Sequence, residues 1–370
     1  MFRILAPLCA LALATSAHAQ NLDAQTPADL LPQAKQEGKV TVYAFTSRIA
    51  RVEKAFEAAY PGIDMVTFDM SSTEQIARIK SEAQANLPGA DVIYISDAPV
   101  VLTELVASNL ISPYVPPRVA GVVAEQFKSP LLAQRLSTKV LMYNEEAHPE
   151  GSPVKNLWDL TKPDWKGRVI IVDPLQRGDY LDLMTEIVLK SDEMAAAYQT
   201  AFGKPITLGS GSENAGQQFI ADLFANDLVL VGSTDDVNKA VGAKGQAKPP
   251  IGFTSYSDRR DNEDEGWALQ VANDVTPSNG IVFPAFLALN PKPANPAAAR
   301  LAIDFMMGDD SETGGDGFKP FYVAGDWPTR SDITPHKDAI ALADFNGWQI
   351  APAETAKIRA EVADFILALQ

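Results

Sequence analysis

The sequence lacks cysteine almost entirely: among 370 residues only Cys9 is a cysteine. Cys9 lies within an N-terminal apolar stretch that is expected to be removed, which leaves the mature chain without a thiol. This excludes a disulfide, a thiolate metal site and a cysteine nucleophile. A chain of this length must then be stabilised by hydrophobic packing, and it is long enough for two hydrophobic cores.

Clusters of basic residues and long apolar runs are also missing. The formal net charge is −16, which makes nucleic acid and anionic membrane surfaces improbable partners. The apolar run from Ile4 to Ala14 is too short to span a bilayer. Because Arg3 precedes this run and Ala17-His18-Ala19 follows it, we predict a secretory signal cleaved after Ala19 and a soluble, exported periplasmic protein.

Catalytic motifs are absent as well. His148 and His336 are the only histidines beyond the predicted signal, and neither belongs to a metal-binding or nucleophile motif. The glycine-rich stretch 209–216 lacks the Lys-Ser/Thr pair of a phosphate loop, so we expect a turn and a helix starting at Ser212 or Glu213. We therefore expect no enzyme, no catalytic residue, no cofactor and no metal site.

The residues that are present alternate between strand and helix patterns. Residues 39–45, 63–70 and 90–96 read as strands, and helical spacing follows each of them. The predicted helices span 50–60, 72–85 and 99–111, and Ser72 with Gln75 forms a capping box in this prediction. Such alternation indicates an α/β fold in which mostly parallel sheets are flanked by helices.

A second series follows residues 136–146. Strands are predicted at 168–174, 227–233 and 279–290, and helices at 179–190, 212–226, 236–245, 296–308 and 352–370. Two α/β units with a return of the chain suggest two lobes joined by more than one crossing, as in hinge-closing binding proteins.

Several segments of the chain, taken in their sequence order, resemble those of a known family. They include "NLWDLTKPDWKGRVIIVDP" and "NPAAARLAIDFMM", which stand in the order found in periplasmic solute-binding proteins of bacterial ABC importers. Within these, the chain resembles the cluster of ferric-ion- and hexose-phosphate-binding proteins. The resemblance implies a type II periplasmic binding fold with the ligand between two lobes. The first lobe would span 20–138 plus 277–340, the second 145–265, and 341–370 would form a C-terminal helical segment.

Loops that follow the predicted strands are the candidates for ligand binding, because α/β sheets bind ligands at the carboxyl ends of their strands. Ser71 to Thr73 opens a helix, where free N–H groups favour an anion. In the second lobe, Asp235 is expected to contact the ligand and Asp236 to cap the helix. The full set of predicted ligand contacts is Thr46, Ser47, Arg48, Ser71, Ser72, Thr73, Asp97, Arg177, Asp179, Thr234, Asp235 and Asp236.

The resemblance leaves several ligands open. The histidine and the tyrosine pair of ferric-binding relatives are replaced here by Ser47 and by Thr234-Asp235 or Asp235-Asp236, while Asp97 retains an acid. Hexose-phosphate-binding relatives use a carboxylate where Asp235 stands, so we expect capture of a phosphorylated sugar-type ligand. Arg177-Gly178-Asp179 departs from the small residues expected there.

The alternatives are a ferric ion, a cationic or aminophosphonate ligand, or an exported hydrolase with Asp179 and Asp235 as acid and base. Membrane permease subunits of the importer are the implied protein partners, and a monomer is expected. Nucleic acid is not an expected partner.

Overall fold

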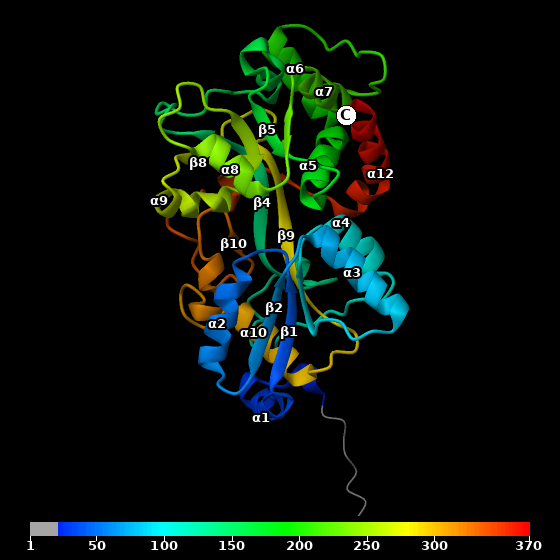
Figure 1. The fold of residues 1–370 in the computed structure, drawn as a ribbon, viewed down its shortest axis with the longest axis vertical. Coiled ribbons are helices and arrows are strands. Elements are labelled where there is room, and N and C mark those ends of the chain that lie inside the picture. The colour runs from blue at the N-terminus through cyan, green and yellow to red at the C-terminus, as the bar shows by residue number, and fades with distance from the viewer. Residues whose placement is uncertain (1–20) are drawn as a thin grey trace, which may run out of the picture.

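The computed structural model describes residues 21–370, so the predicted signal and Cys9 lie outside the described residues. The described residues form two stacked groups of elements, which we call the first lobe, containing β1 to β3, and the second lobe, containing β5 to β7 (Figure 1). Two long strands in the middle of the molecule, β4 (Leu132–Asn144) and β9 (Gly280–Leu289), run from one lobe to the other.

Helices flank three parallel strands in the first lobe. β1 (Lys39–Ala44) pairs in parallel with both β2 (Asp64–Asp69) and β3 (Val92–Ile95). Each strand leads into a helix, as the alternating pattern predicts. The helices of this lobe are α1 (Pro27–Glu37), α2 (Ile49–Ala59), α3 (Ser72–Ala85), α4 (Ala98–Val100), α10 (Pro296–Met306) and α11 (Gly315–Phe318).

The second lobe repeats this architecture. β5 (Val169–Val172) pairs in parallel with β6 (Val229–Val231) and β7 (Ile251–Thr254). A short 3-10 helix, η6 (Tyr256–Asp261), follows β7 directly. The remaining elements of this lobe are α5 (Gly178–Leu189), α6 (Ser191–Phe202), α7 (Ala215–Ala225), α8 (Thr234–Gly242), α9 (Asn262–Glu265), β8 (Leu269–Val271) and α12 (Pro352–Leu369).

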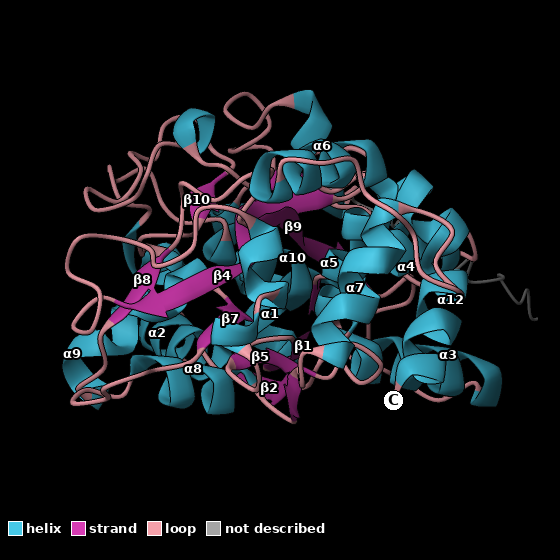
Figure 2. Ribbon diagram, turned by 90° about the horizontal axis from the view of Figure 1, so that it is seen from above, coloured by secondary structure: helices cyan, strands magenta, loops and turns pink. Residues whose placement is uncertain are grey.

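Strand pairing through β4 and β9 joins the lobes into one sheet of eleven strands. Eight of them follow the order β2-β1-β3-β9-β4-β7-β5-β6, and β8, β10 (Trp327–Pro328) and β11 (Trp348–Gln349) pair at its side. β9 pairs antiparallel with β3 and β4, and β4 pairs antiparallel with β7 and β8. The two short strands β10 and β11 pair with β4 and β9. The mixed α/β architecture with helices on the faces of the sheet is the predicted fold class (Figure 2).

Buried apolar residues form separate cores in the two lobes. One cluster gathers around Trp158, Ile171 and Leu183 in the second lobe, and the first lobe has clusters around Val42 and around Ile93. Val362 and Ile366 of α12 belong to the second-lobe cluster, so the C-terminal helix packs as part of that lobe.

Three local predictions are wrong. The helix predicted at 99–111 is the short α4 followed by a π-helical turn at Val101–Val106. Asn214 rather than Ser212 or Glu213 precedes the helix α7, because its side chain accepts a hydrogen bond from the N–H of Gln217. Ser71, not Ser72, caps α3: its hydroxyl accepts from the N–H of Glu74, whose carboxylate bonds back to Ser71.

Candidate functional site

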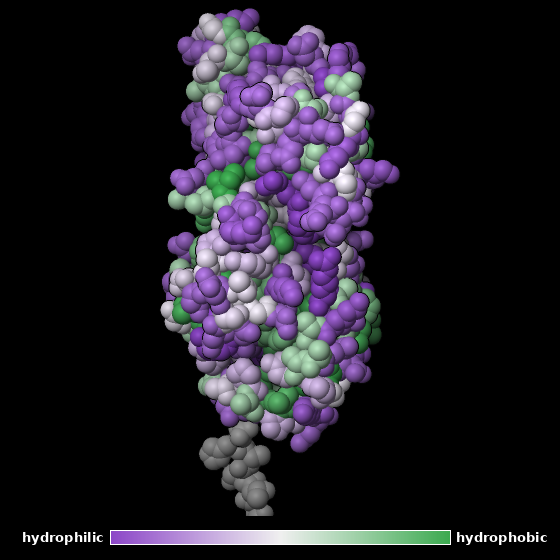
Figure 3. Space-filling model, turned by 90° about the vertical axis from the view of Figure 1, so that its left-hand side faces the viewer, coloured by the Kyte–Doolittle hydropathy of each residue, from purple (hydrophilic) through white to green (hydrophobic). Residues whose placement is uncertain are grey.

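A cavity of about 250 Å³, which we call the inner cavity, lies between the lobes. A wider outer cavity of about 440 Å³ adjoins it and shares Ser47, Arg48, Asp235 and Arg260 with it. The outer cavity lies under α2, α8 and α9, on a face of the molecule that is mostly hydrophilic (Figure 3). The inner cavity is lined by Phe45, Thr46, Ser47, Arg48, Asp69, Arg135, Ser137, Lys139, Arg177, Asp179, Ser233, Thr234, Asp235, Ser255, Ser257, Asp258, Arg260 and Phe283.

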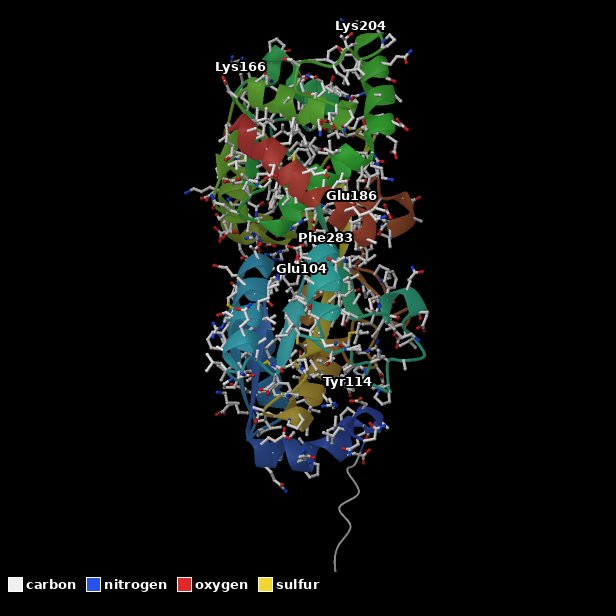
Figure 4. All side chains as sticks on the ribbon, turned by 90° about the vertical axis from the view of Figure 1, so that its right-hand side faces the viewer. Glu104, Tyr114, Lys166, Glu186, Lys204 and Phe283 are labelled. Atoms are coloured by element: carbon white, nitrogen blue, oxygen red, sulfur yellow. The ribbon has the colours of Figure 1, made fainter. Side chains whose placement is uncertain are left out.

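The crossing strand β4 supplies a polar strip to this cavity. Arg135, Ser137 and Lys139 alternate along the strand, so their side chains leave the same face of the sheet. All three side chains are buried, and apolar residues of the same strand belong to the second-lobe core. Phe283 of β9 borders the strip at mid-height between the lobes (Figure 4). We call Arg135, Ser137 and Lys139 the β4 strip.

A buried carboxylate holds the arginines of the first-lobe side in place. Asp326 Oδ2 lies 2.6 Å from Arg48 Nη1 and 3.1 Å from Arg135 Nε. Burial alone would raise the pKa of Asp326, but the charges of Arg135 and Arg48 outweigh burial and lower the pKa. Burial lowers the pKa of Arg135 to about 10, which still leaves the guanidinium charged at neutral pH. Arg48 and Arg135, which both line the cavity, therefore share one buried carboxylate, that of Asp326.

Lys139 connects the strip to the second lobe. Its Nζ lies 3.1 Å from Asp179 Oδ2 and donates a hydrogen bond of 2.7 Å to Ser255 Oγ. Arg177 Nη2 lies 3.7 Å from the same carboxylate oxygen. Burial would raise the pKa of Asp179, but Lys139 and Arg177 lower it below its usual value. Asp179 is therefore a carboxylate held between two cations.

The turn η6 contributes hydroxyl groups. Thr138 Oγ1 accepts a hydrogen bond of 3.0 Å from the N–H of Tyr256, which fixes η6 against β4. Ser257 is only 1% exposed and lines the inner cavity, yet its Oγ has no hydrogen-bond partner among the described residues. Buried hydroxyls normally have a partner, so the Ser257 hydroxyl is available to a polar group that enters the cavity.

Acidic groups lie toward the outside of the inner cavity. Asp69 is the last residue of β2 and Asp235 the second residue of α8, so the two lobes contribute one acid each. Within residues 21–370 neither carboxylate has a hydrogen bond or an ion pair. Burial raises the pKa of Asp69; Arg177 opposes this shift and the charge of Asp235 adds to it.

Seven of the residues predicted as ligand contacts line the inner cavity: Thr46, Ser47, Arg48, Arg177, Asp179, Thr234 and Asp235. Asp236 lines only the outer cavity. The prediction that Asp236 caps α8 is wrong, because Ser233 is the capping residue and donates a hydrogen bond of 2.7 Å to the Asp236 carboxylate.

The structure does not bring Asp97 or the loop from Ser71 to Thr73 to the cavity. Asp97 is 2% exposed and its Oδ2 lies 3.0 Å from Nη2 of Arg359 on α12. Ser72 Oγ lies 2.9 Å from Ser96 Oγ, and the Ser71 hydroxyl donates a hydrogen bond to the Glu74 carboxylate. Each of these groups already has a protein partner.

Sequence reasoning missed the β4 strip and η6. The predicted contacts were all placed in loops that follow predicted strands. The β4 strip lies within a crossing strand, and η6 follows β7, which was not predicted. The signal was present in "RLSTK" (135–139), where charged or polar residues at every second position interrupt an apolar run. The polar residues that line the inner cavity and were not in the predicted set are Asp69, Arg135, Ser137, Lys139, Ser233, Ser255, Ser257, Asp258 and Arg260.

Residues 21–370 contain no group of three or more His, Cys, Asp or Glu arranged to hold a metal ion. Over the same residues no helix combines the length and apolar character needed to cross a membrane.

Comparison with known proteins adds the family context. Residues 40–313 match the family model described as bacterial extracellular solute-binding protein. No curated protein sequence is matched by the chain.

Solved structures with the same fold include three from different bacteria. Iron-bound HitA from Pseudomonas aeruginosa has 18% identity and a TM-score of 0.68, covering 89% of this chain and 99% of its own. Apo ferric ion-binding protein A from Pasteurella haemolytica has 17% identity and a TM-score of 0.66, covering 90% and 98%. AfuA from Actinobacillus pleuropneumoniae, with fructose-6-phosphate bound, has 17% identity and a TM-score of 0.64, covering 90% and 97%.

Proposed function

The chain belongs to the bacterial extracellular solute-binding protein family, and from that premise we propose that it captures a small phosphorylated ligand of the sugar-phosphate type in the periplasm. The ligand occupies the inner cavity, and the loaded protein delivers it to the permease subunits of an ABC importer. We further propose that the lobes move as the units predicted from the sequence, residues 20–138 with 277–340 and residues 145–265.

The observation that carries the proposal is the β4 strip together with the unpartnered hydroxyl of Ser257. Arg135 and Lys139 present positive charge on a buried surface, and Ser255 and Ser257 offer hydroxyl groups beside them. Phosphate oxygens accept several hydrogen bonds at once, and bonds to charged groups are the stronger ones. The anionic end of the ligand therefore binds the β4 strip and not the loop from Ser71 to Thr73.

The charges of the cavity distinguish this proposal from its alternatives. Five cations line the inner cavity, namely Arg48, Arg135, Lys139, Arg177 and Arg260, against the four carboxylates of Asp69, Asp179, Asp235 and Asp258, so the net charge of the lining does not favour a ferric ion. A hydrolase would need one carboxyl able to donate a proton near neutral pH, but the cations beside Asp179 lower the pKa of that group. These charges therefore support ligand binding without catalysis.

The first experiment is a thermal-shift screen of the mature protein with sugar phosphates, phosphonates, amines and ferric salts. A ligand present at a hundred times its dissociation constant adds about 2.7 kcal/mol of stability. Phosphate esters should raise the melting temperature, and stabilisation by ferric salts alone would contradict the proposal.

The second experiment is calorimetric titration of variants with the best phosphate ester. Lys139→Gln removes a charged donor and should weaken binding by about 1.5–3 kcal/mol, and Ser257→Ala by about 1 kcal/mol. Ser257→Ala is the safer variant for folding, because its hydroxyl has no protein partner to leave unsatisfied. The matched control is Lys166→Gln, an exposed lysine in the second lobe far from the cavity (Figure 4).

A further inference from the structure

We propose that Asp179 determines which anions the inner cavity accepts: its unpartnered Oδ1 requires a ligand that carries an O–H group beside the anionic oxygens. The O–H stands either on the phosphorus or on the adjoining carbon chain. This inference rests on the proposed function for the anionic end, which lies on the β4 strip, and it adds a hydrogen-bond donor to the description of the ligand.

One oxygen of the Asp179 carboxylate is left without a partner. Asp179 lines the inner cavity and is only 7% exposed. Its Oδ2 lies 3.1 Å from Lys139 Nζ and 3.7 Å from Arg177 Nη2, whereas Oδ1 has no hydrogen-bond partner among residues 21–370. Buried polar atoms are normally hydrogen-bonded. Oδ1 is therefore available to a donor that enters the cavity.

Asp179 can only accept hydrogen bonds, because it stays ionised. Burial would raise its pKa, but the charges of Lys139 and Arg177 outweigh burial and lower the pKa. The acids that face it behave in the opposite way: burial raises the pKa of both Asp97, after β3, and Asp182, on α5, and the charge of Asp179 adds to each shift. Protons in this cluster are thus held by Asp97 and Asp182 first, and a carboxylate without a proton offers no donor.

Lys139 brings the anionic end of the ligand close to this carboxylate. Its ammonium group has three N–H donors; it donates to Ser255 Oγ over 2.7 Å and pairs with Asp179 Oδ2, which leaves one donor for a ligand oxygen. With hydrogen bonds of about 2.9 Å at tetrahedral angles, that oxygen lies about 5 Å from Asp179 Oδ2. A neighbouring O–H of the same ligand bridges this gap, whereas a methylene group does not.

An anion without such an O–H binds less well for two reasons. Its charge is repelled by the Asp179 carboxylate, and Oδ1 stays buried without a partner. An O–H on the ligand counters both effects, because O–H···O⁻ hydrogen bonds are short and strong. The Ser257 hydroxyl, which also has no partner among the described residues, makes no such demand, since it can itself donate to the anionic oxygens.

The first measurement compares 2-hydroxyethyl phosphate with ethyl phosphate by calorimetric titration of the full mature protein at about pH 8. A phosphate ester, whose second pKa is about 6, carries almost no P–OH there. If the donor is on the carbon chain, the hydroxylated ligand binds at least about tenfold more tightly, since ethyl phosphate leaves Oδ1 without a partner.

The second measurement counts protons, by titrating ethyl phosphate at about pH 7 in two buffers of different ionisation enthalpy. If the donor is on the phosphorus, binding takes up more than about half a proton, because most of the free ester is a dianion at this pH. Asp97→Asn is measured in parallel, so that a proton taken up by Asp97 is not counted as one on the ligand.

Asp179→Asn replaces the acceptor by an N–H donor if its amide oxygen keeps the contact with Lys139. It should therefore abolish the hydroxyl preference or the proton uptake that the parent shows. Asp192→Asn is the matched control, because it removes the same charge from an exposed position on α6 that lines neither cavity, and it should leave both quantities unchanged.

Equal binding of the two ligands by the parent, together with no proton uptake, would overturn the role of Asp179 and leave the anionic site standing. This comparison does not depend on the folding of any variant. Failure of both ligands to bind would overturn the anionic site as well. A preference or a proton uptake that persists in Asp179→Asn would show that another group reads the O–H, which also contradicts the inference.

Discussion

Ser71 determines where α3 begins, because its hydroxyl accepts a hydrogen bond from the N–H of Glu74 while the Glu74 carboxylate bonds back. Ser71→Ala should lower the free energy of unfolding by about 1 kcal/mol through the lost cap. Urea denaturation checks this, with Thr73→Ala as the neighbouring control that leaves the cap intact. Equal loss in both variants would contradict the assigned cap. Because Ser71 lies away from the cavity, ligand affinity should be unchanged.

Asp97 and Asp182 share one cation, Arg359, whose Nη2 and Nε lie 3.0 and 2.8 Å from the two carboxylates. One cation cannot neutralise two buried acids. Burial raises the pKa of Asp97 to about 6, with Arg359 opposing and Asp179 adding to the shift, and the pKa of Asp182 is also well above its usual range. The contribution of Asp97 to stability is thus full below about pH 4 and is lost as the pH rises through about 6.

Asp97→Asn should remove this dependence, because asparagine does not titrate and tolerates the left-handed backbone conformation of residue 97, where φ is 68°. Between pH 4 and 7 the stability of the parent should fall relative to that of the variant by on the order of 2 kcal/mol. Denaturant titrations across this range measure the difference. A difference that stays constant with pH would show that Asp97 keeps an ordinary pKa in the folded protein.

Two residue-level features, the cap of α3 and the partner of Asp97, could not be predicted from the sequence. Ser71 with Glu74 and Ser72 with Gln75 both satisfy the capping-box pattern, and only the backbone conformation decides between them. Likewise Asp97 follows a strand as a ligand residue would, but its partner Arg359 is 262 residues away in the chain. No local pattern predicts such a pair.

At the scale of elements, strands and helices with clear periodicity were predicted to within a few residues, as β1, α3 and α10 show. The β4 strip was missed because charged residues within a buried strand are rare, and their burial is made favourable by partners from distant segments. Asp326 and Asp179 are those partners. The seven predicted residues that do line the cavity lie on loops that follow strands or at helix starts, where the topology of parallel strands already places ligands.

Gly280, at the start of β9, allows the two crossing strands to approach each other. Its φ is 146°, and a Cβ atom there would overlap the carbonyl group of Lys139 on β4. Gly280→Ala should destabilise the protein by more than about 1 kcal/mol and weaken ligand binding, because it displaces Lys139. Gly121→Ala is the control, since a Cβ atom there meets nothing within 4 Å. Thermal unfolding and titration of both variants test the prediction, and equal behaviour would contradict it.

At the scale of the whole molecule, the lobes are joined by β4, β9 and the C-terminal helix α12. The apolar side of α12 packs in the second-lobe core, while its Arg359 reaches Asp97 of the first lobe. Figure 4 shows α12 beside the π-helical turn that carries Glu104. The inner cavity lies at the level of these connections, so closure of the lobes would change its width.

The account depends most on where the anionic group binds, and a crystal structure of the mature protein with bound arsenate locates it directly through anomalous scattering. Arsenate has the shape and charge of phosphate. We predict one peak within hydrogen-bond distance of Lys139 Nζ and Ser257 Oγ, at the β4 strip. A peak at the amino end of α3, beside Ser71 to Thr73, or no peak in the inner cavity at saturating arsenate, would contradict the account.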